Sequence, residues 1–219
     1  MNIALIRFFY SLTPHAYKKG QIILRSEMKA YSYLYYLEKG YIKAYSLLSN
    51  GNEKNYVFYK SGEIFPITWT FNNLNKHLYY QAMSDVILYK VPRQKFINFI
   101  HNKPNVLLDV VHRIIDIHNI YIDRVDNLEY TNSCARVISC LLFLAKRFGK
   151  KKNNSILIQI PLTHNDIATS IAMTRETASR EIEQLMKLNI ISTKDHLIFI
   201  KDIKRLEKKL EDCIGNNCH

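Results

Sequence analysis

The residues best suited to chemistry lie together near position 175. The run reads Thr174-Arg175-Glu176-Thr177-Ala178-Ser179-Arg180, which places two guanidinium groups, a carboxylate and several hydroxyls within about two helical turns. An arginine fork matches the O6 and N7 acceptors of guanine, and a glutamate accepts from the N4 amino group of cytosine. Exposed helices often carry such charges without any role. The run therefore indicates base reading only if the surrounding elements form a scaffold that presents it to DNA.

The flanking segments predict such a scaffold. Thr163 is a suitable N-cap, and Asp166 stands three residues later in the capping-box position. A first helix of about two turns follows, and a short break over 172–174 leads to a second helix that Thr174 caps. Two helices joined by a three-residue turn are typical of a helix-turn-helix motif, whose second helix places its N-terminal residues against base edges.

The rest of the C-terminal part predicts short supporting elements. We expect, in chain order, a helix capped by Asn132 and ending at Gly149, a basic loop over 150–154, a strand over 156–160, and a hairpin of strands 191–193 and 196–200 with its turn at Lys194-Asp195. This hairpin would lie beside the second helix as a wing.

The N-terminal part, residues 17–100, has the composition of short strands. Runs rich in β-branched and aromatic residues cover 33–37, 41–48, 56–59 and 86–91, with turn signals between them. Asn50-Gly51 stands between two of these runs and favours a hairpin. Several short strands at this spacing indicate an antiparallel barrel or sandwich.

A heptad pattern begins where the strand pattern ends. Apolar positions alternate four and three residues apart at Leu107, Val111, Ile114, His118, Tyr121, Val125 and Leu128. A seam of this kind favours a two-stranded coiled coil, so we expect residues 107–128 to pair two copies of the chain. His118 is expected to be satisfied within the seam rather than to act as a pH sensor.

The charge balance favours a polyanionic partner. Thirty-one Lys and Arg residues stand against 19 Asp and Glu, a net charge of +12, which suits nucleic acid first and an anionic membrane surface second. No uncharged apolar run reaches the ~18 residues of a membrane-spanning helix, and the N-terminus makes a poor signal peptide. We therefore expect a cytoplasmic protein with no membrane partner. The sequence offers no nucleophile–base pair, metal box or phosphate loop, so we do not expect an enzyme.

The four cysteines are Cys134, Cys140, Cys213 and Cys218, and no two form a Cys-x-x-Cys pair. Cys213, Cys218 and His219 are three potential metal ligands at the C-terminal end. The spacing favours unpaired thiols over a metal site.

The order of these elements resembles the CRP/FNR family of bacterial transcription regulators over about residues 15–205. Residues 174–180 carry the most specific likeness. The resemblance implies guanine contacts for Arg175 and Arg180, a cytosine contact for Glu176 and a phosphate contact for Thr163. Ala172 stands where many members have glycine, a departure of modest cost. The expected DNA-binding set is Thr163, Thr174, Arg175, Glu176, Thr177, Ser179 and Arg180.

The resemblance also raises the question of an effector, because the family's barrel often binds a cyclic nucleotide. The pairs that would hold its ribose and phosphate fall on Pro66-Ile67 and Lys76-His77, and a base-contacting helix position falls on Tyr121. Proline lacks an N–H, isoleucine accepts no hydrogen bond, and lysine offers a point charge rather than a fork. We do not expect cyclic nucleotide binding. The candidate effector pocket is Phe65, Pro66, Ile67, Lys76, His77 and Tyr121.

Two other sensor chemistries of the family are also not expected. No cysteine precedes Cys134, so the N-terminal cluster that an FNR-type iron–sulfur centre needs is missing. His77 alone is a weak indication of haem. The aromatic residues of the barrel fit core packing, and a hydrophobic effector or none fits equally well.

Together these features predict an α+β chain. We expect an N-terminal antiparallel β jelly-roll barrel over 1–102, a long dimerisation helix over 103–130 and a C-terminal winged helix-turn-helix domain over 131–219. A homodimer would read a pseudo-palindromic site in double-stranded DNA, with a hinge near residues 130–132 and RNA polymerase as a candidate further partner. The alternative is a ligand-binding signalling module whose basic C-terminal domain engages a protein or RNA.

Overall fold

The computed structural model describes residues 2–25, 32–71, 78–152 and 155–215. Lys76, His77, Cys218 and His219 lie outside this part of the chain. The chain divides into two compact units, residues 1–120 and residues 121–219. Each unit is described by itself.

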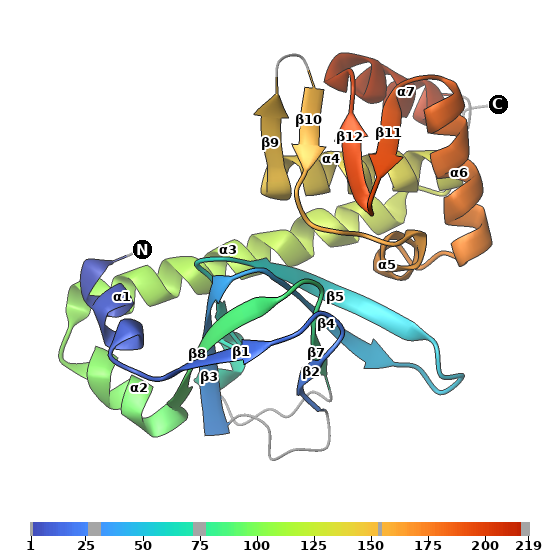
Figure 1. The fold of residues 1–219 in the computed structure, drawn as a ribbon. Coiled ribbons are helices and arrows are strands. Elements are labelled where there is room, and N and C mark those ends of the chain that lie inside the picture. The colour runs from blue at the N-terminus through green and yellow to red at the C-terminus, as the bar shows by residue number, and fades with distance from the viewer. Residues whose placement is uncertain (1, 26–31, 72–77, 153–154, 216–219) are drawn as a thin grey trace. The chain divides into compact units, whose positions relative to one another are not determined.

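Two antiparallel four-stranded sheets make up most of the first unit (Figure 1). One sheet has the order β1-β8-β3-β6, with strands Pro14–Tyr17, Val86–Pro92, Tyr33–Lys39 and Ile64–Phe65. The other has the order β2-β7-β4-β5, with strands Ile22–Leu24, Tyr79–Ala82, Tyr41–Leu47 and Glu53–Lys60. The predicted jelly-roll fold is confirmed. Strands β1, β2, β6 and β7, each of four residues or fewer, were not among the predicted runs.

Aromatic rings fill the space between these strands. The Phe65 ring packs against those of Tyr35, Tyr59 and Tyr80, with centroid separations of 5.4, 5.3 and 5.2 Å. All four side chains are buried. Offset and tilted ring pairs at these separations are favourable beyond the apolar area they bury. These aromatic residues therefore serve as core.

Helices close one end of this unit. Helix α1 (Ile3–Tyr10) buries Leu5 and Phe9 completely. Its Phe8 ring stacks on the Phe99 ring of α2 (Arg93–His101), with the ring centroids 3.9 Å apart. The apolar N-terminal segment is thus an amphipathic helix of the fold. A short 3-10 helix, η2 (Thr68–Thr70), follows β6.

The long helix α3 (Pro104–Glu129) carries two different faces. Val106, Val110, Ile117 and Ile120 form a buried stripe, and Arg113 on the same side donates to the carbonyl of Gly62 at 2.9 Å. A second stripe is exposed and alternates three and four residues apart: Leu108, Val111, Ile115, His118, Ile122 and Val125. This stripe shares Val111, His118 and Val125 with the predicted seam. Leu107 of the predicted seam is exposed as well. Ile114, Tyr121 and Leu128 of that seam are partly covered, and the exposed stripe has Ile115 and Ile122 in place of Ile114 and Tyr121.

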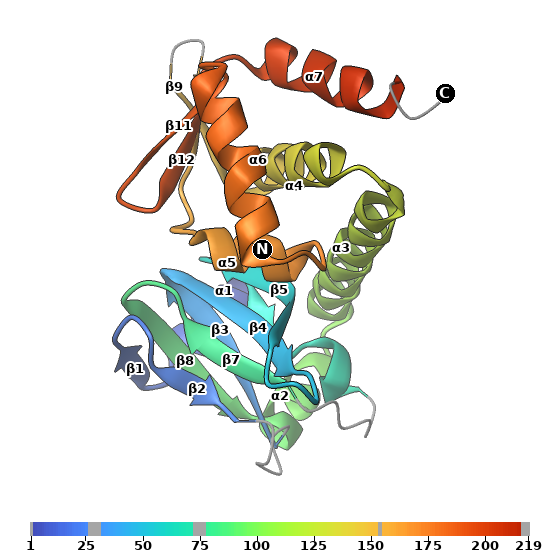
Figure 2. The same ribbon diagram turned by 90° about the vertical axis from the view of Figure 1, so that its right-hand side faces the viewer.

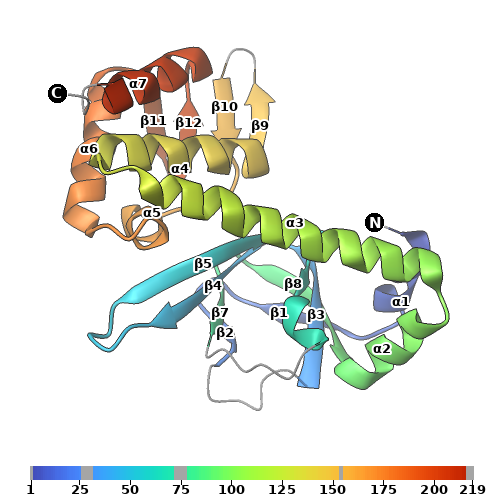
Figure 3. The same cartoon turned by 180° about the vertical axis from the view of Figure 1, so that it is seen from behind.

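The second unit places a small sheet against helices. Strands β9 (Gly149–Lys152), β10 (Ser155–Ile158), β11 (Ile191–Lys194) and β12 (Leu197–Ile200) take the order β11-β12-β10-β9. Helix α4 (Ser133–Phe148) runs across one face of this sheet (Figure 3). Its N-cap is Asn132, whose Oδ1 accepts from the Cys134 amide, and it ends at Gly149 as predicted. The other helices are α5 (His164–Ser170), α6 (Arg175–Lys187) and α7 (Ile203–Gly215).

Two local expectations were wrong in this unit, and one helix was not predicted. The basic loop was expected over 150–154, but residues 150–152 belong to edge strand β9, because they pair with β10 while Lys150 and Lys151 stay exposed. The wing turn falls on Asp195-His196, one residue later than predicted, because Lys194 already pairs with Leu197. Helix α7 was not predicted, and it packs on α4 through Leu206 and Cys213.

Gly40 offers a direct test of the first unit's packing. Its φ is +95°, and an added Cβ would lie 2.4 Å from the Asp85 carbonyl oxygen. Gly40→Ala should lower the free energy of unfolding by about 2–4 kcal/mol through backbone strain plus overlap, measured by urea denaturation. Gly51→Ala is the matched control, because Gly51 has φ +80° and no atom lies within 4 Å of its Cβ position. This variant should lower the free energy of unfolding by the backbone strain alone. Equal losses would mean that the close approach at Asp85 contributes nothing.

Candidate nucleic-acid interface

The helix-turn-helix motif is built from α5, α6 and the turn between them. Thr163 caps α5 in a reciprocal capping box with Asp166, as predicted. Ala172 in the turn has φ +52°, so alanine does occupy the left-handed conformation. Ala178, Ile182 and Leu185 form the buried face of α6. Figure 2 shows α6 against α4 and α5.

The N-terminal half of α6 carries the charged residues of the predicted DNA-binding set, and Arg175, Glu176 and Arg180 are all exposed. Glu176 and Arg180 lie on the side of the helix away from its buried face, whereas Arg175, seven residues before Ile182, is exposed in the first turn. The Arg180 side chain is 65% exposed, and its guanidinium lies 3.8 Å from the Glu181 carboxylate. The N–H groups of the first turn add a partial positive charge that favours phosphate.

The hydroxyl members of the predicted set form hydrogen bonds within the protein. The Thr174 side chain caps α6 by accepting from the Thr177 amide at 3.2 Å, and the two threonine hydroxyls share a hydrogen bond. The Thr163 hydroxyl donates to the Asp166 carboxylate at 2.6 Å. The Ser179 hydroxyl oxygen lies 2.9 Å from Nδ1 of His164, within hydrogen-bond distance. The structure thus gives all four a positioning role.

Glu181 is a residue of this region that sequence reasoning missed. Its side chain is buried, with the residue 6% exposed, and its Oε1 accepts from the Ser133 hydroxyl at 2.7 Å. A buried carboxylate needs such a partner because its desolvation is costly. The signal was available, because position 181 lies three residues after Ala178 and four before Leu185 and so belongs to the buried face. This bond ties α6 to the first turn of α4.

A hollow of about 320 Å³ lies where the starts of α5 and α6 meet the wing. His164, Arg175, Lys194 and His196 line it, with Asp195 as the single carboxylate. Burial and the nearby charge of Arg175 lower the pKa of His164, and His196 acts in the same direction, against a smaller opposing effect of Glu183. The wing and both helices therefore contribute positive charge or histidine to one concave surface.

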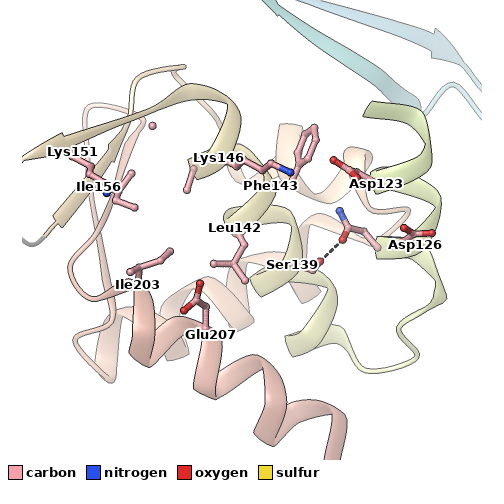
Figure 4. A pocket seen from close by; sticks show the side chains of 13 residues that line it. Asp123, Asp126, Ser139, Leu142, Phe143, Lys146, Lys151, Ile156, Ile203 and Glu207 are labelled. Atoms are coloured by element: carbon pink, nitrogen blue, oxygen red, sulfur yellow. Dashed lines mark hydrogen bonds between the residues drawn. The ribbon is translucent and has the colours of Figure 1, made fainter. Parts of the chain in front are cut away.

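A second hollow, of about 660 Å³, lies beside α4 (Figure 4). Its lining combines the carboxylates of Asp123, Asp126 and Glu207 with the amines of Lys146 and Lys151. At its edge the Ser139 hydroxyl hydrogen-bonds to Asn127, which joins α4 to the last turns of α3. The hollow leaves open space next to this junction.

The described members of the candidate effector pocket are Phe65, Pro66 and Ile67 in the first unit and Tyr121 in the second. Phe65 and Ile67 are buried in the core of the first unit, with Ile67 1% exposed, and the Pro66 carbonyl accepts from the Thr70 hydroxyl at 3.1 Å. Tyr121 lies on α3 within the second unit. Neither Pro66 nor Ile67 supplies the donor and acceptor that a nucleotide ribose would need, so these two residues do not fit a cyclic nucleotide.

Comparison with known proteins agrees with this architecture. The family model of the cyclic nucleotide-binding domain matches residues 14–103, and that of the Crp-like helix-turn-helix domain matches residues 135–209. The fumarate and nitrate reduction regulatory protein of Yersinia pestis is 24% identical over 191 residues, covering 86% of this chain and 75% of its own length. The global nitrogen regulator of Synechococcus elongatus is 25% identical over 165 residues, covering 73% and 72%.

Solved structures share the fold. A CooA mutant from Carboxydothermus hydrogenoformans has a TM-score of 0.76 at 19% identity, covering 93% of this chain and 90% of its own. FixK2 from Bradyrhizobium japonicum has a TM-score of 0.73 at 21% identity, covering 90% and 96%. The chain therefore belongs to the CRP/FNR family, a class of transcription regulators with a helix-turn-helix domain.

The described ranges contain neither a membrane-spanning helix nor a cluster of metal ligands. No described helix combines the length and the apolar character needed to cross a membrane. Within the same ranges, no group of three or more His, Cys, Asp or Glu side chains is arranged to hold a metal ion.

The position of His164 predicts a pH dependence of stability. Because its pKa is lowered in the folded protein, the unfolded chain binds more protons below about pH 6.5. The free energy of unfolding should therefore fall as the pH drops from 7.5 to 5.5, and His164→Gln should reduce that fall. Urea denaturation at several pH values measures both slopes. Identical slopes for the two proteins would contradict the assignment.

Proposed function

We propose that two copies of this chain bind a pseudo-palindromic site in duplex DNA, each reading one half-site through the N-terminal half of α6. Residues 1–102 would act as the sensor-type barrel, 103–130 as the dimerisation helix and 131–219 as the DNA-binding domain. RNA polymerase is a candidate partner at the promoter. The observation that carries the proposal is the exposure of Arg175, Glu176 and Arg180 in the N-terminal half of a helix that buries Ala178, Ile182 and Leu185.

The chemistry of that face supports base reading. Arg175 and Arg180 each offer a planar fork that matches guanine, and Glu176 can accept from cytosine. The hollow between α5, α6 and the wing brings Lys194 beside Arg175, and the Lys194 amine suits a phosphate oxygen next to the base that Arg175 contacts. The hydroxyls that cap α5 and α6 hold both helices in place for these contacts.

The exposed stripe of α3 supports the dimer. Six positions from Leu108 to Val125 repeat three and four residues apart, and five of them are apolar side chains left in water. Pairing with the same stripe of a second copy would bury them in a coiled-coil seam. Two-fold symmetry then places two recognition helices on half-sites about one helical turn of DNA apart.

The junction between α3 and α4 supports a hinge near residues 130–132. The Arg136 guanidinium donates to the Tyr130 carbonyl at 2.6 Å and to the Ile171 carbonyl at 3.4 Å. One side chain thus joins the end of α3 to the turn of the helix-turn-helix motif. The open hollow beside Asn127 and Ser139 gives α4 room to move. We propose that this hinge sets the spacing of the recognition helices without a cyclic nucleotide.

Selection of bound duplexes from a random DNA pool, using the purified full-length chain, tests the proposal. We expect enrichment of a palindrome whose half-sites contain guanine. On the selected site, Arg180→Ala should weaken binding by about 1–3 kcal/mol and relax specificity at one base position per half-site, measured by titration against duplexes varied at single positions.

Lys187→Ala is the matched control for that measurement. Lys187 is an exposed cation in the last turn of α6, and its removal should leave base preference unchanged. Equal loss of affinity for the selected and for random DNA would make Arg180 a phosphate contact. Enrichment of no sequence would favour the rival class, a module whose basic domain engages a protein or RNA.

The stripe on α3 predicts the effect of one buried charge. Ile122→Asp would place a carboxylate in the seam of both copies and remove two isoleucine contacts, so the dimer dissociation constant should rise at least about 100-fold. Sedimentation equilibrium measures it. Asn119→Asp, which adds the same charge beside the stripe, should change it little. A dimer unaffected by Ile122→Asp would place the interface elsewhere.

A further inference from the structure

Two cysteines far apart in sequence meet in the second unit. Cys134 lies in the first turn of α4, and Cys213 lies near the end of α7. Burial and the nearby Cys213 thiol raise the pKa of the half-buried Cys134 thiol, and Cys213 itself is 6% exposed. Both thiols are free, as the sequence predicts.

The backbone around the two thiols is held by a single side chain. Asn132 accepts from the Cys134 amide at 2.8 Å and donates to the Cys213 carbonyl at 3.3 Å. This bridge fixes the start of α4 against the last turns of α7. Because one side chain bonds to the backbone of both cysteines, the two residues lie on neighbouring segments, and a local movement of α7 toward α4 can bring their sulfurs to disulfide bonding distance.

We propose that Cys134 and Cys213 form a thiol–disulfide switch that links α7 to α4. The oxidant would be a low-molecular-weight disulfide. The Cys134 thiolate attacks one sulfur of that disulfide and releases the other half as a thiolate. The Cys213 thiolate then attacks the Cys134 sulfur and displaces the second half. Two electrons reduce the small disulfide to two thiols, which take up the two cysteine protons.

The surroundings make this switch slow. Burial, the hydrogen bond to Cys213 and the nearby Glu181 carboxylate raise the pKa of Cys134 to about 12, against a smaller opposite effect of Lys209. Only a small fraction is thiolate at neutral pH, and exchange requires the thiolate. The rate of oxidation should therefore rise nearly tenfold for each pH unit between 7 and 9.

The switch also has a route to the recognition helix. Ser133, the neighbour of Cys134, donates to the buried Glu181 carboxylate of α6 at 2.7 Å. A disulfide between the two sulfurs draws the first turn of α4 toward α7. The turn then leaves the position in which Ser133 bonds to Glu181. This movement strains the Ser133–Glu181 bond. Oxidation should then lower affinity for specific DNA at least threefold, a consequence that rests on the proposed function.

Redox equilibration of the full chain tests the covalent step. A Cys218→Ser variant removes the one cysteine outside the described residues, and the protein is equilibrated at pH 8.5 in mixtures of reduced and oxidised glutathione. Peptide mapping by mass spectrometry should find a Cys134–Cys213 disulfide that dithiothreitol reverses. The disulfide should also raise the melting temperature, because it restrains the unfolded chain.

The remaining cysteine provides the control. Cys140 is buried, and burial raises its pKa to about 12 as well. A Cys140→Ser variant should form the same disulfide, whereas Cys134→Ser and Cys213→Ser should form none. Free thiols at both positions after full equilibration, or a disulfide that includes Cys140, would overturn the proposal.

The DNA measurement separates the switch from the proposed function. The affinity of the reduced and the oxidised chain for the selected duplex is compared, with the Cys134→Ser variant treated in parallel as the chain that cannot switch. Loss of affinity in the oxidised chain alone supports the switch. Equal affinities with a mapped disulfide overturn its regulatory role. A reduced chain without sequence preference contradicts the proposed function while leaving the covalent step intact.

Discussion

The arrangement of the second unit depends on one constraint, that α6 must bury one face firmly while leaving the other in water. Ala178, Ile182 and Leu185 provide the buried face. Their packing sets the rotation of the helix and so decides that Arg180 points outward, while Arg175 is exposed because it begins the helix. The Glu181–Ser133 hydrogen bond adds a directional restraint to this non-directional packing. A base-reading helix needs both, because an arginine fork tolerates little misplacement.

Much of this arrangement follows from local patterns that a sequence displays. The caps at Asn132, Thr163 and Thr174 are short-range side-chain interactions with the backbone, and they fix where three helices begin. The apolar spacing in α6 fixes its buried face. The longer strands of the jelly roll are also recoverable, because a run of seven or eight residues displays its period.

The remainder depends on partners distant in sequence. Edge strand β9 exists only because β10 pairs with it, and a lysine-rich run gives no sign of that partner. The hydrogen bond between Ser179 and His164 on the preceding helix joins positions fifteen residues apart. The hydrogen bond from Asn132 to the Cys213 carbonyl joins positions about eighty residues apart. On α3, partial covering of Ile114 and Tyr121 shifts the exposed stripe by one residue. Periodicity alone does not reveal which flank is covered.

The wing ends in a two-residue turn whose residues, Asp195 and His196, have φ of +52° and +63°. Asparagine and glycine adopt this geometry at little cost, whereas a histidine there is strained by about 1 kcal/mol. In return for this strain, the His196 imidazole and the Asp195 carboxylate line the hollow beside Arg175. Replacing Asp195-His196 by Asn-Gly would stabilise the hairpin but remove the carboxylate and the imidazole from its turn. At these two positions, the residues that would best stabilise the turn differ from those that supply polar groups to the hollow.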